Sequence, residues 1–440
     1  MRKHKKVGIY TYGCALNKAD SEIIATLLSN RGFEISFNEN EDKDIIIVNT
    51  CTVKTPTERK IIRKLRKLED LKGKTKVIVT GCMPVAQPDI VNEFKNFSFI
   101  GTNVFDILDA IEYILNPKDK KKRFVKISNE RNKSIELERK FRFNPFVEII
   151  PIAQGCLGNC SYCITKNARG SLRSLPEEKI IKEMKKVIKS NKVKEIWLTA
   201  QDTGAYGLDL GTTLPELLNK ISEEVKGEFF IRVGMMNPTH VKKFLNELVK
   251  SYKENENLYK FLHLPLQSGD DKILNDMKRG YKVKDFKEII KKFRKEIPRI
   301  TISTDVIVGF PTETEKEFLN TLKLIKEIKP DIVNISRFWS RPGTIASKMK
   351  ELPGRETKRR SRIIVKLFKE IGLRRNKKWI SWQGKVLVSE LGKFQNSYVA
   401  RNFAYKPIII NSKENLLGKF VKVKIKDATY FDLRGEMIKN

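Results

Sequence analysis

The sequence predicts an α/β chain made of an N-terminal open parallel α/β domain, a central partial (β/α)6 TIM-like barrel and a small C-terminal OB-like β-barrel. Three observations lead to this prediction. The first part repeats a strand and a helix at about the length of a βαβ unit, and the second contains six such alternations. The last part has short strands with glycine at the turns. The expected boundaries are 1–117, 118–145 for a basic connector, 146–375 and 376–440.

In the N-terminal domain, three β-like runs each lead into a cysteine. The runs cover residues 7–12, 45–48 and 77–79, and the cysteines are Cys14, Cys51 and Cys82. Helical patterns over residues 17–30, 56–71 and 104–115 lie between and after them. Because ligands gather outside the carboxyl ends of parallel strands, we expect the three thiols to converge in one crevice. The alternative is three unrelated buried thiols, since free cysteine is often a core residue.

The central domain alternates strands with amphipathic helices. The helices include residues 177–189, 284–295 and 314–329, and the six strand candidates are residues 147–153, 195–200, 229–234, 261–265, 302–308 and 332–338. Six repeats indicate an open six-stranded barrel rather than a closed barrel of eight strands. In such a barrel, catalytic groups belong at the carboxyl ends of the strands.

The first barrel strand leads into the most informative motif of the chain, Cys156-Leu-Gly-Asn-Cys160-Ser-Tyr-Cys163. Three thiolates on so short a loop can hold three irons of a cubane cluster, and the fourth iron is then open to a small molecule. The alternative is a zinc knuckle whose fourth ligand lies elsewhere. The chain has only 3 histidines, which disfavours that alternative.

The C-terminal domain is expected to bind nucleic acid. Its strand candidates cover residues 386–390, 397–401, 407–411 and 421–425, and aromatic and basic side chains such as Phe394, Tyr398 and Arg401 interleave there. A small barrel with aromatic and basic residues on one face is a common design for binding single strands. The alternative is a capping domain whose aromatic residues form its core.

The charge indicates a polyanionic partner. The net charge is +35, from 88 basic and 53 acidic residues. Residues 118–142 hold 11 basic and 4 acidic residues, residues 355–378 hold 11 and 2, and residues 379–440 hold 11 and 5. The alternative is a solvated lysine-rich surface, although matching glutamates would normally accompany it. An apolar run near 18 residues is lacking, and the six cysteines are not expected to form disulfides. We therefore expect a cytoplasmic protein without a membrane segment.

With these motifs the chain resembles the radical S-adenosylmethionine (SAM) methylthiotransferases over nearly its whole length. The tail resembles a TRAM domain, a small RNA-binding β-barrel. One departure is Thr312, which stands where the family usually has glycine after Gly-Phe-Pro. The matching segments are residues 11–22, 48–53, 80–83, 155–163, 198–207, 263–269, 304–314 and 340–344.

The resemblance implies two 4Fe-4S clusters and two uses of SAM. Cys156, Cys160 and Cys163 would hold the radical SAM cluster, which donates one electron to SAM and so produces the radical that abstracts hydrogen. The second, auxiliary cluster would supply the sulfur, and another SAM would supply the methyl group. The ligands of this auxiliary cluster would be Cys14, Cys51 and Cys82.

Other site residues are carried over by position. Tyr162 would flank the adenine of SAM, with ordinary core packing as the alternative. Gln201 and Asp202 would hold the SAM amino group and ribose, and Thr304 and Asp305 would shape the SAM pocket. No residue beyond the cluster ligands is expected to be catalytic.

Two further residues, His263 and Gln267, are expected to face the mouth of the barrel and contact the substrate. For His263, a structural histidine is the alternative. In the tail, the RNA contacts are expected from the aromatic and basic residues named above.

The resemblance also indicates a substrate. The segment Ser340–Ala346 and the basic stretch after Gly354 resemble the archaeal and eukaryotic branch. That branch methylthiolates carbon 2 of N6-threonylcarbamoyladenosine at tRNA position 37, next to the anticodon. The alternatives are isopentenyl-adenosine in tRNA, an aspartate of a ribosomal protein, or a non-catalytic iron–sulfur RNA-binding protein. The expected partners are tRNA, a reducing electron donor and a sulfur source, and the chain is expected to be a monomer.

Overall fold

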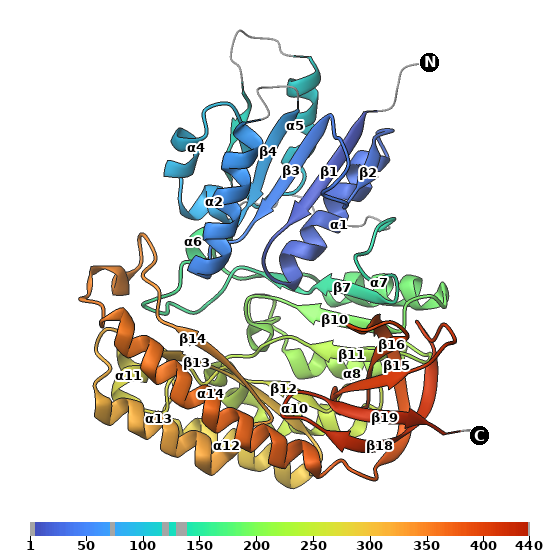
Figure 1. Ribbon diagram of the computed structural model, residues 1–440, viewed down its shortest axis with the longest axis vertical. Helices are drawn as coiled ribbons and strands as arrows, with labels where there is room; N and C mark the ends of the chain where they lie inside the picture. The colour runs from blue at the N-terminus through green and yellow to red at the C-terminus, as the bar shows by residue number, and fades with distance from the viewer. Residues whose placement is uncertain (1–4, 71–74, 117–122, 129–138, 439–440) are drawn as a thin grey trace.

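A computed structural model describes residues 5–70, 75–116, 123–128 and 139–438 (Figure 1). It confirms the predicted fold class: a parallel α/β sheet, a partial barrel and a small closed β-barrel follow one another along the chain. Among the described residues, no helix has both the length and the apolar character that a membrane span requires.

The N-terminal domain is a parallel sheet with the strand order β2-β1-β3-β4-β5-β6. The strands are β1 (Lys6–Thr11), β2 (Glu34–Ser36), β3 (Ile45–Thr50), β4 (Lys76–Gly81), β5 (Ser98–Ile100) and β6 (Val125–Lys126). The edge strand β6 comes from the segment predicted as a connector, so part of that segment completes the sheet. Of the predicted connector, residues 118–122 and 129–138 lie outside the described residues.

Helices cover both faces of this sheet because its strands alternate apolar side chains toward each face. Ile45 and Ile47 pack on the side of α1 and α5, whereas Ile46 and Val48 pack on the side of α2 and α4. The helices are α1 (Ala15–Ser29), α2 (Thr55–Glu69), α3 (Cys82–Ala86), α4 (Asp89–Glu93) and α5 (Asp106–Leu115).

The central domain is a partial barrel made of two three-stranded parallel sheets, ordered β11-β10-β7 and β12-β13-β14. A parallel bridge between Ile231 and Leu258 joins the two sheets. The strands are β7 (Val147–Pro151), β10 (Glu195–Thr199), β11 (Phe230–Val233), β12 (Phe261–His263), β13 (Thr301–Val308) and β14 (Ile332–Arg337), with a short pair β8 (Ala153–Gln154) and β9 (Arg173–Ser174).

Helices line the outside of the partial barrel and end with α14, which leads into the tail (Figure 1). The larger ones are α7 (Glu177–Lys189), α8 (Leu214–Glu224), α10 (Leu245–Glu254), α12 (Val283–Glu296), α13 (Glu315–Ile328) and α14 (Gly354–Lys377). The short ones are α6 (Thr165–Arg169), η1 (Thr203–Ala205), α9 (Pro238–Val241), η2 (Lys242–Phe244), α11 (Asp271–Asp276) and η3 (Ile345–Lys348).

The tail is a closed five-stranded barrel with the strand order β15-β16-β17-β19-β18. Its strands are β15 (Gln383–Leu391), β16 (Ser397–Arg401), β17 (Pro407–Asn411), β18 (Phe420–Ala428) and β19 (Leu433–Met437). The sequence reasoning missed β19, because only Leu433 of its residues is buried and the strand lacks an apolar pattern.

Buried ion pairs join the N-terminal domain to the barrel. The Arg139 guanidinium lies 3.3 Å from Glu22 of α1 and 2.9 Å from Glu148 of β7. Near the other end of the interface, Arg341 pairs with Glu58 of α2. Ion pairs also join the partial barrel to the tail. The buried Asp331, just before β14, pairs with Arg375 of α14 and with Lys406, which lies between β16 and β17 of the tail barrel.

Candidate functional site

The three N-terminal cysteines lie at the carboxyl ends of adjacent strands β1, β3 and β4. Cys51 and Cys82 directly follow their strands and are buried, whereas Cys14 is exposed and caps the start of α1. The turn from β4 into Cys82 requires glycine: Gly81 has a φ of +97°, and a Cβ there would lie 2.5 Å from the Thr50 carbonyl oxygen.

Two buried asparagines hold these strand ends together. The Asn17 Nδ2 donates hydrogen bonds to the carbonyl oxygens of Tyr12, at 3.0 Å, and of Thr50, at 2.8 Å. The Asn49 Nδ2 donates to the Ser21 hydroxyl at 2.9 Å. Both asparagines stand within three residues of a cysteine in the sequence, which is the signal that could have identified them.

The second cysteine set lies on the loop after β8, and backbone contacts shape this loop. The Gly155 N–H donates to Gln201 Oε1 at 2.7 Å, and the Gly158 N–H donates to the Cys156 sulfur at 3.2 Å. The Ser161 hydroxyl donates to the Asp276 carbonyl oxygen at 2.7 Å. The bonds to Gln201 and Asp276 attach the loop to the barrel, and the bond to Cys156 lies within the loop.

Each cysteine set receives a hydrogen bond from one buried arginine. Arg169 Nε lies 3.3 Å from the Cys82 sulfur, and Arg279 Nη1 lies 3.3 Å from the Cys160 sulfur. Arg169 is the last residue of α6, which begins two residues after Cys163. Therefore α6 reaches from one cysteine set to the other. The sequence reasoning missed both arginines.

The thiol environments fit cluster ligands. Burial raises the pKa of Cys51 and of Cys156 to about 11, so these thiols are protonated without metal and release protons when metal binds. Among the described residues, no three side chains of the kinds that bind metals converge on a single ion. A cubane cluster does not need such convergence, because its thiolates bind different irons.

Gln201 and Asp202, which are predicted to bind SAM, lie beside the cysteine loop, and both make hydrogen bonds within the protein. The Gln201 side-chain oxygen accepts the loop hydrogen bond from Gly155. Asp202 is buried; its carboxylate accepts hydrogen bonds from the Gly204 N–H and the Asn237 N–H, and it lies 2.8 Å from His240 Nδ1.

Tyr162 and Thr304 also have structural contacts. The Tyr162 ring packs against a buried cluster that includes Ile273 and Phe310, which agrees with the core-packing alternative. Thr304 is buried, and its hydroxyl donates to the Leu264 carbonyl oxygen at 2.8 Å. Thr304 therefore joins β13 to the segment after β12.

His263, Asp305 and Asn334 form a polar group at three neighbouring strands. His263 Nε2 lies 3.1 Å from Asp305 Oδ2, and Asn334 donates to Asp305 Oδ1 at 2.8 Å. Burial alone would raise the pKa of Asp305, but these bonds hold it below its usual value. Gln267 adopts a positive φ of 68°, and its side-chain oxygen is buried and accepts no hydrogen bond from the described residues.

The residues predicted to bind RNA in the tail differ in exposure. Phe394 is 74% exposed, which suits a stacking role. Tyr398 is 8% exposed and belongs to the buried cluster of the tail barrel, which agrees with the alternative of a core aromatic. Arg401 lies over the Tyr405 ring, at 4.6 Å from its centroid, and 3.4 Å from Glu390.

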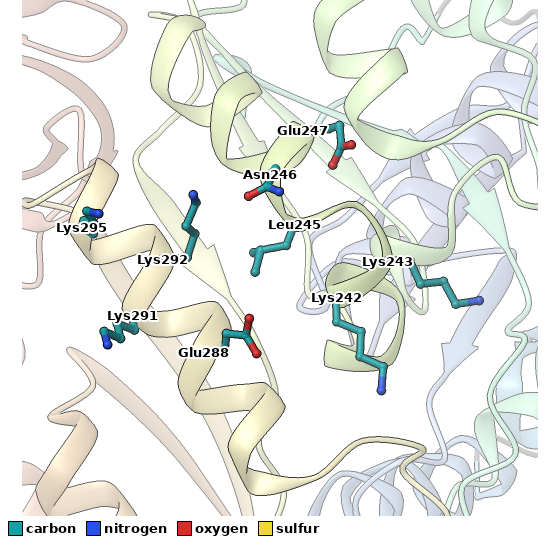
Figure 2. A pocket seen from close by; sticks show the side chains of 9 residues that line it. All are labelled: Lys242, Lys243, Leu245, Asn246, Glu247, Glu288, Lys291, Lys292 and Lys295. Atoms are coloured by element: carbon teal, nitrogen blue, oxygen red, sulfur yellow. The ribbon is translucent and has the colours of Figure 1, made fainter.

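A lysine-rich groove on the outer face of the barrel was not singled out from the sequence (Figure 2). It runs between η2 with the start of α10 on one side and α12 on the other. Paired lysines at 242–243 and 291–292 are the signal that could have found it. Its charged side chains are Lys242, Lys243, Glu247, Glu288, Lys291, Lys292 and Lys295.

Three family models match this chain. They are the Radical SAM superfamily over residues 150–325, the Uncharacterized protein family UPF0004 over residues 6–101 and the TRAM domain over residues 385–438. The two cysteine sets fall within the first two matches, and the five-stranded tail barrel corresponds to the third.

The chain is also similar to curated proteins along its whole length. A probable threonylcarbamoyladenosine tRNA methylthiotransferase of Pyrococcus horikoshii is 46% identical over 98% of this chain and 99% of its own length. The threonylcarbamoyladenosine tRNA methylthiotransferase of Homo sapiens is 36% identical over 99% of this chain and 74% of its own length.

Among solved structures, a radical S-adenosylmethionine methyltransferase, TsrM, from Kitasatospora setae superposes with a TM-score of 0.56. It is 13% identical, and the superposition covers 78% of this chain and 77% of that one. At this identity the likeness concerns the fold alone.

Proposed function

The chain belongs to the family of threonylcarbamoyladenosine tRNA methylthiotransferases, which are radical SAM enzymes, and from this premise we propose its reaction. It inserts a sulfur and a methyl group at carbon 2 of N6-threonylcarbamoyladenosine at tRNA position 37. The observation that carries the proposal is the presence of two three-cysteine sets on either side of α6, which brings the groups for both halves of this reaction together.

The residues fit two 4Fe-4S clusters. Cys156, Cys160 and Cys163 would hold the first, and the N-terminal set at positions 14, 51 and 82 would hold the second. When bound, the first cluster supplies the electron that cleaves SAM, and the second supplies the sulfur.

The arginines act on the cluster ligands. Arg279 donates an N–H to the Cys160 sulfur, and Arg169 donates one to the Cys82 sulfur. At Cys82, the charge and hydrogen bond of Arg169 favour the thiolate form, but burial is the larger effect and raises the pKa of this thiol. The two arginines would each donate a hydrogen bond to one ligand sulfur of a bound cluster.

The substrate is received where the N-terminal domain faces the barrel. Asp305 is bonded to His263 and Asn334, and its carboxylate also experiences the charge of Lys54, three residues after Cys51. Both domains thus contribute charged groups to the same space. We assign the direct contacts with SAM and substrate to Asp305 and His263.

The other residues predicted from the sequence to bind SAM or substrate would line or support the space that receives the substrate. Tyr162, Gln201, Asp202 and Thr304 would shape the SAM pocket through the loop and strands that they hold, and Gln267 would offer its buried oxygen to the substrate. The partners are tRNA, which suits the net charge of +35, together with a reducing electron donor and a sulfur source. We propose a cytoplasmic monomer.

The test uses anaerobically reconstituted protein with SAM, a reductant and tRNA that carries N6-threonylcarbamoyladenosine. We expect mass spectrometry of the digested tRNA to show the 2-methylthio derivative, accompanied by 5′-deoxyadenosine. A product formed only on isopentenyl-adenosine tRNA or on a ribosomal peptide would overturn the substrate assignment. Absence of 5′-deoxyadenosine from reconstituted protein would indicate an iron–sulfur protein without turnover.

A further inference from the structure

A pocket of about 270 Å³ lies where the inner face of the partial barrel meets the tail barrel. Strands β11 to β14 form one wall, and the segment between β16 and β17 forms another. The tail domain therefore contributes side chains to the lining of the pocket. The residues that matter here are Arg232, Phe261, His263, Asn334, Arg401 and Tyr405.

Arg232 is the unusual group in this pocket. Its guanidinium lies 5.2, 5.4 and 5.5 Å from the ring centroids of Trp197, Phe261 and Tyr405. Its Nε is buried and has no hydrogen-bond partner among the described residues. Arg232 is half-buried, and taking part of a guanidinium out of water is costly unless an anion compensates it; aromatic rings compensate only in part.

The carboxylates around the pocket are hydrogen-bonded to or paired with other groups, although the charge of Glu195 also acts on Arg232. Asp331 pairs with Arg375 at 3.0 Å and with Lys406 at 2.9 Å. Glu195 accepts hydrogen bonds from an indole N–H and a tyrosine hydroxyl, and Asp305 is bonded to an imidazole and an amide. The pocket thus combines aromatic walls with a guanidinium that still has donors to offer an anion.

The pocket continues from the substrate space into the barrel. His263 belongs to both, since it lines the pocket and bonds to Asp305. Phe261 is two residues earlier on β12, so its side chain lies on the same face of the strand, one layer deeper. A group attached to a base held near His263 can therefore extend toward Arg232.

We propose that this pocket receives the threonylcarbamoyl group on N6 of the target adenosine and that Arg232 binds its carboxylate. The inference rests on the proposed function, which supplies this substrate. A guanidinium binds a carboxylate through two parallel hydrogen bonds, which gives both affinity and orientation. An uncharged isopentenyl group would leave the guanidinium unpaired, so the pocket also selects against that substrate.

The first test compares Arg232→Gln with Arg299→Gln in the reconstituted holoenzyme. Arg299 is a matched control, because it lies 5.3 Å from the Trp379 ring centroid but is exposed and outside the pocket. With tRNA carrying N6-threonylcarbamoyladenosine, we expect Arg232→Gln to raise the KM about ten- to hundredfold, the usual effect of losing a charged hydrogen bond. Arg299→Gln should stay within twofold of wild type.

The second test needs no variant and so does not depend on folding. Wild-type protein is titrated with the nucleoside N6-threonylcarbamoyladenosine and with its methyl ester, which lacks the negative charge. We expect the ester to bind at least tenfold more weakly. Equal affinities, or a KM for Arg232→Gln equal to that of the control, would overturn the inference. If the wild-type enzyme makes no methylthio product on the modified tRNA, the proposed function fails instead.

Discussion

Arg169 Nε lies 3.3 Å from the Cys82 sulfur, although 87 residues and a domain boundary separate the two along the chain. The same guanidinium lies 2.8 Å from Asp20 and 3.2 Å from the Asn17 side-chain oxygen, so the N-terminal domain holds it on several sides. Because Arg169 ends the short helix that follows Cys163, this contact positions one cysteine set relative to the other.

The first prediction concerns metal content. Two three-thiolate sites imply about eight irons per reconstituted chain. Changing Cys156, Cys160 and Cys163 together to alanine should leave about four irons and abolish the cleavage of SAM to 5′-deoxyadenosine. Iron and sulfide analysis gives the answer, and a triple variant that retains about eight irons would contradict the assignment.

The second prediction separates the roles of the two sets. Cys51→Ala should block formation of the methylthio product while 5′-deoxyadenosine still forms, because the other set stays intact. Cys156→Ala is the matched comparison and should lose both products. For each variant, the methylthio product and 5′-deoxyadenosine are measured by mass spectrometry in the same reaction. Unchanged methylthio product from Cys51→Ala would refute the role of the N-terminal set.

The third prediction concerns the arginines at the sulfurs. Arg169→Gln removes a positive charge and an N–H donor from Cys82, which makes an added electron less favourable there. We expect the reduction potential of the second cluster to fall by on the order of 60–130 mV, from the worth of one charged hydrogen bond. Arg279→Gln should lower the reduction potential of the first cluster only. Redox titrations followed by electron paramagnetic resonance measure the potentials of both clusters. If either variant shifted the potential of the other cluster instead, the pairing of each arginine with its cluster would be contradicted.

The fourth prediction concerns Asp331, which joins the barrel to the tail through Arg375 and Lys406. Asp331→Asn leaves buried positive charge uncompensated and should lower the free energy of unfolding by about 3–5 kcal/mol. Asp427→Asn, at an exposed tail position, should change it by less than about 0.5 kcal/mol. Denaturant titrations provide the measurement, and equal losses in the two variants would argue against this ion cluster.

The effect of Asp331 should also depend on pH. Burial alone would raise the pKa of Asp331, but Lys406 and Arg375 hold it below the ordinary value of 3.8. Because the folded pKa lies below the unfolded one, the contribution is complete above the ordinary value and is lost as the pH falls through the folded value. The difference between wild type and Asp331→Asn should therefore be constant from about pH 8 to pH 5 and shrink below about pH 4.

The fifth prediction concerns tRNA binding by the tail. Phe394→Ala should weaken tRNA binding about five- to hundredfold if its exposed ring stacks on a base. Leu391→Ala is the matched control, because Leu391 is 69% exposed on the same barrel but has no ring. Filter binding with labelled tRNA compares them. Equal effects of the two variants would show that Phe394 acts only as apolar surface.

The positions of the six cysteines could be interpreted from the sequence because their signals are local. A strand with an apolar run ends directly before Cys51 and before Cys82, and parallel strands bring their carboxyl ends to one edge. The second set can be recognised without knowing the strand order, because its three cysteines lie within eight consecutive residues, Cys156 to Cys163. Many of the longer strands and helices in the three domains followed from the same local periodicity.

Contacts between distant parts of the chain were beyond sequence reasoning. Tyr398 was expected at the surface because aromatic and basic residues interleave along this segment, but in the closed barrel Tyr398 is buried. Val125 and Lys126 looked like a connector, and only the free edge at β5 made them a strand. In both cases the partner surface, rather than the residue itself, determined the environment.

The sequence by itself determined the fold class, the two cysteine sets and the basic character that suits RNA. These properties depend on spacing, alternation and composition, which any segment carries wherever it is placed. Only the tertiary structure decided that Arg169 and Arg279 bond to cysteine sulfurs and that the buried Arg232 Nε has no hydrogen-bond partner among the described residues. The physical reason is that an arginine's role depends on which charges and rings surround it, and packing brings those neighbours from distant parts of the chain, as with Arg279 and Cys160, which are 119 residues apart.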